Sequence, residues 1–225
     1  MNNASYAQGA GAGVADKSGF VTLPSPEGLP TREKVLSAAA RVFSAKDFYH
    51  TKLEEIADVA GLGKGTIYLH FKDKNDLFIS TMEYVQDALL AQTEEKLTGI
   101  TSPMMRLRLA IQLWLGHFLE QPVGILSYRS YTTMLPAEFT DRIVENKNKA
   151  QAFFVALLNA IAQKFGHRSL KRPSELLAEV LLDAIIGYVS RPDSAGFSKD
   201  YPPEKYAIFL TDLILPQHEW MKEQS

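Results

Sequence analysis

The sequence contains no cysteine, so disulfide bonds, thiolate metal sites and thiol redox sensors are excluded. No apolar run approaches the roughly 20 residues that are needed to cross a bilayer. The N-terminus lacks both a basic start and an apolar segment, which argues against a secretory signal. From these absences we expect a cytoplasmic protein without a membrane partner.

Neither sign of charge dominates, because 24 Lys and Arg residues stand against 26 Asp and Glu residues. The chain is therefore not coated with positive charge in the manner of a histone-like protein. A small basic face that an acidic remainder balances is still compatible with DNA binding. Apolar residues make up 46% of the 225 positions, which is enough for a substantial core.

The first 29 residues are rich in Gly, Ala, Ser and Asn, and we expect them to form a flexible arm. An arm beside a DNA-binding domain can enter a minor groove. This one carries a single basic residue, Lys17, so a disordered tail is the favoured interpretation.

From Pro30 onward, apolar residues recur at helical spacing nearly throughout. Thr31 is the predicted N-cap of a first helix. Thr51 is the predicted N-cap of a second helix, with Glu54 at the capping-box position and Gly61 as its stop. A third helix covers about 64–70, and Asp73 caps a long fourth helix that ends near residue 99. Prolines mark the ends of further helices, which we expect at 103–119, 124–133, 137–165, 174–190 and 203–222. No stretch alternates like a strand, so the predicted fold is all-α.

The segment 53–70 has the spacing of a helix-turn-helix. Ala57 is small where two helices must cross closely, and Gly61, four residues later, permits a positive φ in the turn. Ile67 returns an apolar side chain to the same core after six more residues. This order of small, glycine and β-branched residues is the steric requirement of the motif, in which the helix over 64–70 would read DNA.

The residue types around this helix suit a DNA surface. A lysine can meet phosphate or guanine, a glycine allows close approach, and a threonine can reach base edges. Tyrosine and histidine can donate to phosphates, and a helix N-terminus attracts an anion. The bordering lysines make the face locally positive, whereas Phe71 is expected to pack inside. The predicted DNA contacts are Thr51, Lys52, Lys64, Gly65, Thr66, Tyr68, His70 and Lys74.

The segment 31–77 resembles the N-terminal signature of the TetR/AcrR family of regulators, including the distinctive Tyr-x-His-Phe at 68–71. The resemblance covers less than a quarter of the chain. The other matching positions are Thr31-Arg-Glu-Lys-Val-Leu, Ala39-Ala40, Phe43, Thr51, Ile56-Ala57, Ala60-Gly61, Gly65, Lys74 and Leu77. The resemblance implies a three-helix DNA-binding domain at 30–77, and a larger helical ligand-binding and dimerisation domain at 78–225. It also implies a homodimer whose recognition helices enter successive major grooves, and which a bound inducer controls.

Other functions are compatible with parts of this pattern. Gly61 to Thr66 superficially suggests a phosphate loop, but Gly65 intervenes between Lys64 and Thr66, and no strand precedes them. A helical-bundle enzyme or lipid-binding protein could use the motif structurally. We find no nucleophile–base pair or carboxylate cluster, so we expect neither an enzyme nor a cofactor. An activator or a nucleoid-associated factor remains the alternative to a repressor.

The C-terminal part carries large rings with polar tips, which an apolar ligand pocket requires. An ordinary helical core requires the same residues, and for each ring singly core packing is favoured. Arg129 could neutralise an anionic ligand or form a surface ion pair. His117 and Glu120 could hold a metal, but two ligands are too few for a site, so none is predicted. The candidate contacts of an unidentified small-molecule effector are Trp114, His117, Phe118, Tyr128, Arg129 and Tyr131.

The two last predicted helices, 174–190 and 203–222, have more apolar surface than one core needs. The apolar positions are Leu176, Leu177, Val180, Leu181, Ala184, Ile185 and Tyr188 on the first of them, and Tyr206, Phe209, Leu210, Leu213 and Ile214 on the second. This excess predicts a four-helix dimer interface between two copies of the chain. A twofold dimer in turn predicts a palindromic DNA operator with half-sites about one helical turn or a little more apart.

Overall fold

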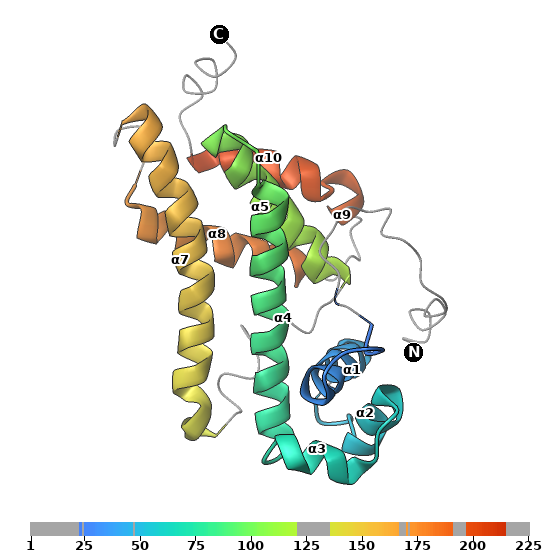
Figure 1. The fold of residues 1–225 in the computed structure, drawn as a ribbon. Helices are drawn as coiled ribbons and strands as arrows, with labels where there is room; N and C mark the ends of the chain where they lie inside the picture. The colour runs from blue at the N-terminus through green and yellow to red at the C-terminus, as the bar shows by residue number, and fades with distance from the viewer. Residues whose placement is uncertain are drawn as a thin grey trace.

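The computed structural model describes residues 23, 25–46, 48–120, 136–166, 170, 172–190 and 197–214. These residues form helices and no strand, so the all-α prediction is confirmed (Figure 1). The elements are α1 (Thr31–Ala45), α2 (Leu53–Ala60), α3 (Lys64–His70), α4 (Lys74–Leu97), α5 (Pro103–Glu120), the 3-10 turn η1 (Ala137–Phe139), α7 (Thr140–Phe165), α8 (Ser174–Val189), α9 (Phe197–Asp200) and α10 (Pro203–Ile214).

The helix ends agree only partly with the predictions. Pro103 and Pro203 are the first residues of α5 and α10, as their fixed φ favours. The helix predicted from residue 137 begins instead with the η1 turn, and α9 was not predicted. The helix predicted at 124–133 and the last part of the one at 203–222 lie outside the described residues.

Two predicted N-caps are wrong and one is confirmed. Pro30 holds the N-cap position of α1, so Thr31 is already helical. Lys52 holds the N-cap position of α2, and Thr51, one residue before it, is buried with 2% of its surface exposed. Asp73 caps α4, since its Oδ1 accepts the N–H of Asp76 at 2.9 Å.

The first three helices pack on the start of α4 around a cluster that we call the N-terminal core. Phe43 and Phe78 meet edge to face at its centre, with ring centroids 4.9 Å apart. Ile56, Ile67 and Phe71 close it from α2, from α3 and from the residue after α3. The predicted packing role of Phe71 is confirmed by its 2% exposure.

Helices α5, α7, α8 and α10 surround a second cluster, the C-terminal core. Trp114 lies in it beside three phenylalanine rings: it stacks on Phe153, and it meets Phe118 and Phe154 edge to face. Among the described residues, no helix is long and apolar enough to cross a membrane.

The long helix α4 belongs to both cores and joins them (Figure 1). Its residues from Leu77 to Val85 pack in the N-terminal core, and Leu89 and Leu97 pack in the C-terminal core. Phe139, from η1, also enters the N-terminal core. The predicted domain boundary at residue 77 stays a prediction, because packing of the N-terminal core continues along α4 beyond it.

Candidate DNA-binding surface

The turn between α2 and α3 has the geometry that the sequence predicts. Gly61 adopts φ 64° and ψ 38°, a left-handed conformation that glycine occupies without a Cβ clash. The N–H of Leu62 donates to the carbonyl of Ala57 at 2.9 Å, and that of Gly61 donates to Asp58 at 3.0 Å. This pair of bonds is a Schellman motif, which ends α2 and sends the chain sharply into α3.

Helix α3 buries one side chain and presents the others. Ile67 is 1% exposed and anchors α3 on the N-terminal core. The predicted contacts Lys64, Gly65, Tyr68 and His70 are exposed, and Thr66 is half-buried. The structure thus places these five on one short helix that the core holds from one side only.

Leu69 is an exposed apolar residue that the predicted set of contacts omits. Its side chain is 81% exposed on α3, between Tyr68 and His70. An isolated aliphatic side chain on a reading helix can contact a thymine methyl group. Its position outside the buried face of α3 is the signal that could have added it to the predicted contacts.

Lys64, the first residue of α3, forms an ion pair with another residue of the same chain. Its Nζ donates to Oε1 of Glu54 on α2 and lies 5.9 Å from the ring centroid of Tyr68. The hydrogen bond between them lowers the pKa of Glu54 and raises that of Lys64. Both side chains stay about half exposed, so a phosphate can compete for the ammonium group.

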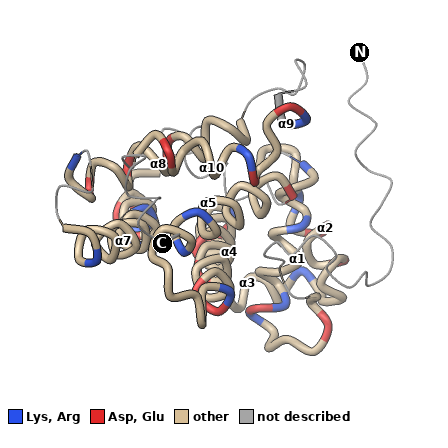
Figure 2. Tube along the Cα trace, turned by 90° about the horizontal axis from the view of Figure 1, so that it is seen from above, with Lys and Arg blue, Asp and Glu red and all other residues tan. Residues whose placement is uncertain are grey.

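The border of α3 is less basic than the sequence suggests. Lys72 pairs with Glu138 at 3.2 Å, and Lys46 pairs with Glu55 at 2.8 Å. Figure 2 shows basic and acidic positions interleaved around α1 to α3 rather than gathered by sign. The prediction of a simply positive face therefore omitted the acidic partners that the fold brings to its lysines.

Three further predicted contacts lie around this border. Lys52 is exposed at the N-cap of α2. The Nζ of Lys74 lies 4.5 Å from the ring centroid of Phe48 and donates to the carbonyl of Tyr49 at 3.4 Å. The buried side chain of Thr51 does not face the surface.

The residues predicted to bind an effector divide into two groups. Trp114, His117 and Phe118 are buried on α5 in the C-terminal core. The Trp114 Nε1 has no hydrogen-bond partner among the described residues. Tyr128, Arg129 and Tyr131 lie outside the described residues. Nor does the described part of the chain contain a group of three or more potential metal ligands.

The last helices keep an apolar face that their own core does not cover. On α8, Leu176 and Val180 are each 48% exposed, and on α10 Phe209 and Leu213 are 54% and 55% exposed. In both pairs the residues are four apart, so they share one side of the helix. The rings of Tyr188 and Tyr206 stack at 4.6 Å and join the two helices.

Comparison with known proteins gives the same family. The sequence model described as "Bacterial regulatory proteins, tetR family" matches residues 35–81. The transcriptional repressor BepR of Brucella suis is 29% identical over 172 residues, which cover 73% of this chain and 81% of BepR. The regulator AcrR of Shigella flexneri is 47% identical over 57 residues, 25% of this chain and 26% of AcrR.

Solved structures share the fold. The transcriptional regulator FadR of Bacillus subtilis, in complex with stearoyl-CoA, has a TM-score of 0.66 at 17% identity over 81% of this chain and 97% of its own. AibR, in complex with isovaleryl coenzyme A and operator DNA, has a TM-score of 0.62 at 19% identity, over 83% of this chain and 99% of its own. The named relatives are transcriptional regulators and not enzymes. The helix-turn-helix and these matches show that the chain carries the DNA-binding domain of the TetR/AcrR family of transcriptional regulators.

Proposed function

We propose that the chain is a cytoplasmic, homodimeric repressor that binds a palindromic operator and is released by a small apolar or amphipathic effector. The exposed face of α3 is the main support for this proposal, because Ile67 is the buried residue of the helix, and Lys64, Tyr68 and His70 are exposed. Lys64 and Thr66 would contact base edges or phosphates, and Gly65 would allow close approach. Tyr68 and His70 would donate to phosphates, with Lys52 and Lys74 at the border.

The uncovered face on α8 and α10 supports the dimer. Apolar side chains that are about half exposed on two adjoining helices gain free energy when a second copy covers them. Two such helices from each copy would form a four-helix interface. A twofold axis through it would place the two α3 helices for successive half-sites of a palindrome.

The aromatic cluster around Trp114 supports an effector with apolar character. Its rings offer a large apolar surface, and the Nε1 of Trp114 offers a hydrogen-bond donor. Two proteins of this fold hold acyl-CoA molecules. The effector would enter among the C-terminal helices and displace α4. This helix directly follows α1–α3 and the turn after them, which together we call the reading head. To release DNA, it must bind the displaced state more tightly by a few kcal/mol.

The proposed function is tested by selecting bound DNA from a random-sequence pool. We expect enrichment of one palindrome, which we call the selected duplex. When this duplex is placed in the promoter of a reporter gene, the protein should lower expression of the reporter. If no sequence were enriched and the protein bound all duplexes with the same salt-dependent affinity, it would be a non-specific DNA-associated protein. A rise in reporter output would indicate an activator, and the related protein FasR of Mycolicibacterium smegmatis is a transcriptional activator.

The ion pair between Lys64 and Glu54 leads to opposite predictions for the DNA affinity of two variants. Glu54→Gln should strengthen binding to the selected duplex about three- to tenfold, because it frees the ammonium group of Lys64 for DNA. Lys64→Ala should weaken binding by a similar factor and lower the salt slope by about 1. Mobility shifts over a salt series measure both effects. Equal affinity of Glu54→Gln and the wild type would show that the carboxylate does not compete.

Tyr68 gives a second prediction for the same surface. Tyr68→Ala should weaken binding about tenfold and leave the melting temperature within about 1 °C, because the side chain is 51% exposed. Tyr201→Ala is a matched control, since that tyrosine is equally exposed at 51% and lies outside the reading head. If both variants bound the selected duplex as the wild type does, Tyr68 would lie outside the interface.

A further inference from the structure

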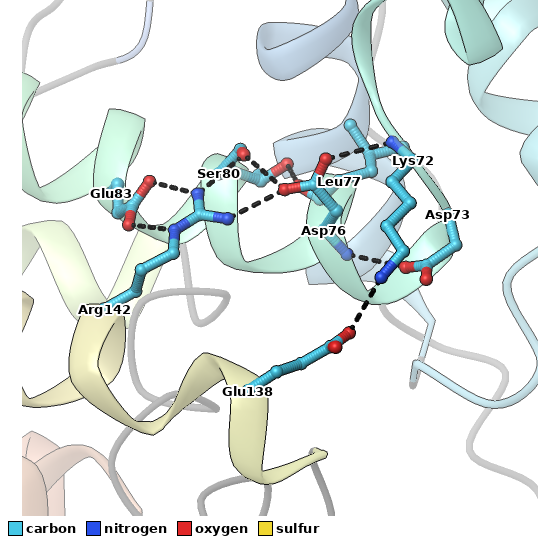
Figure 3. A network of polar contacts seen from close by, with 9 residues as sticks. Lys72, Asp73, Asp76, Leu77, Ser80, Glu83, Glu138 and Arg142 are labelled. Atoms are coloured by element: carbon cyan, nitrogen blue, oxygen red, sulfur yellow. Dashed lines mark hydrogen bonds and ion pairs between the residues drawn. The ribbon is translucent and has the colours of Figure 1, made fainter.

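Arg142, in the first turn of α7, reaches across to the start of α4 (Figure 3). Its Nε donates to Oε1 of Glu83 at 2.8 Å, and its Nη2 donates to the other oxygen of the same carboxylate. Its Nη1 donates to Oδ1 of Asp76 at 2.7 Å, and Nη2 also donates to Oγ of Ser80 at 2.9 Å. One guanidinium therefore holds three successive turns of α4, in a fixed geometry that a bidentate pair enforces.

Asp76 connects this guanidinium to the end of the reading helix. Its second oxygen, Oδ2, accepts the backbone N–H of Lys72 at 3.0 Å, and Lys72 lies two residues after α3 ends. Burial raises the pKa of Asp76, but the Lys72 N–H and the Arg142 guanidinium outweigh that effect and keep the net pKa below its usual value. The ionised carboxylate thus joins the α3–α4 turn to α7.

The residues just before Arg142 contact the reading head as well. Glu138 pairs with the side chain of Lys72 at 3.2 Å, and Phe139 is buried in the N-terminal core with 5% exposure. Figure 3 shows both ion pairs approaching the α3–α4 turn from the η1–α7 side. The stretch 138–142 is therefore a second connection between the two halves of the molecule, in addition to the covalent one through α4.

The reading head needs such a connection to keep its orientation. Packing along α4 changes from the N-terminal core to the C-terminal core between Val85 and Leu89. Without a second connection, bending of α4 in this stretch would tilt one half of the molecule against the other. We propose that Arg142 is a positioning residue for DNA binding. Through Asp76 and Glu83 it fixes the angle of α3 against α7, and so the separation of the two α3 helices in the dimer. This inference rests on the proposed dimeric function.

The test compares Arg142→Gln with the wild type on a set of spacings. The probes are the selected duplex and versions with one base pair inserted or removed at its centre. Wild-type protein should discriminate strongly among them, because each base pair shifts and rotates one half-site. Arg142→Gln should bind the selected duplex about tenfold more weakly and should discriminate among the spacings several-fold less. Arg142→Lys, which keeps the charge but loses the bidentate geometry, should fall between them.

A matched control uses another ion pair between the same two helices. Lys149→Gln breaks the pair that Lys149 on α7 forms with Asp87 on α4 at 3.1 Å, beyond Val85 and away from the α3–α4 turn. This variant should keep the spacing preference of the wild type. If Arg142→Gln loses affinity equally on all spacings, as a merely destabilised protein would, the proposal is overturned.

Amide hydrogen exchange gives a readout without DNA. In Arg142→Gln, the peptide that covers Lys72 should exchange about tenfold faster, whereas peptides from α1 should be unchanged. If Arg142→Gln does not fold, the same exchange measurement is made on Arg142→Lys and Glu83→Gln. Unchanged exchange at the turn would overturn the positioning role, even if no duplex were selected and the proposed function itself had failed.

Discussion

Val180→Asp and Phe209→Asp should each convert the proposed dimer into a monomer and lower affinity for the selected duplex at least about 100-fold. The two side chains are 48% and 54% exposed on α8 and α10, so the substitutions leave the core of one copy intact. In the proposed dimer, however, each substitution would bury an unpaired carboxylate, which is unfavourable in free energy. Because of the twofold symmetry, this penalty would occur twice in each interface. Light scattering after size exclusion measures the mass, and mobility shifts measure the affinity.

Met105→Asp is the control for these two variants. Met105 is 58% exposed in the first turn of α5 and takes no part in the proposed interface. This variant should remain dimeric and bind as the wild type does. Dimeric Val180→Asp and Phe209→Asp proteins with full affinity would place the interface elsewhere.

Trp114→Ala should lower the free energy of unfolding by about 3–5 kcal/mol, because it empties the centre of the C-terminal core. Trp114 is 1% exposed and contacts Phe118, Phe153 and Phe154. Urea denaturation measures the change. The partially collapsed site should also abolish any effector response, since the same rings supply the proposed pocket.

Trp114→Phe separates the packing of the ring from its polar group. It keeps an aromatic ring and removes the Nε1 donor, which has no partner among the described residues. We expect a loss of only about 1–2 kcal/mol, from the lost volume, with no further cost for a broken hydrogen bond. A loss as large as that of Trp114→Ala would show that Nε1 is bonded within the folded chain.

The sequence predicts best the features that depend on neighbouring residues. The bounds of α3 and the left-handed Gly61 follow from local sterics, because a tight turn between two short helices leaves few residue choices. Asp73 is likewise predicted from the segment that it caps. The exposed face of α3 follows once Ile67 is assigned to the core.

Contacts between distant segments could not be predicted in this way. Arg142 and Asp76 are separated by 66 positions, and no periodicity shows that α7 passes the start of α4. The pairing of Lys64 with Glu54 spans the turn, and Glu54 fits a capping box equally well on sequence alone. Thr51 shows the same difficulty, because tertiary packing buries a hydroxyl that local rules assign to a helix end.

Phe139 comes late in the chain yet fills the N-terminal core, and this has a consequence for folding. A nascent chain that has only just completed α4 lacks this side chain, so its reading head has an incompletely filled interior until η1 has been synthesised. Loss of either half would likewise remove apolar surface from the other. The two halves are thus coupled in their stability through Phe139, so a substitution in one half can change the stability of the other.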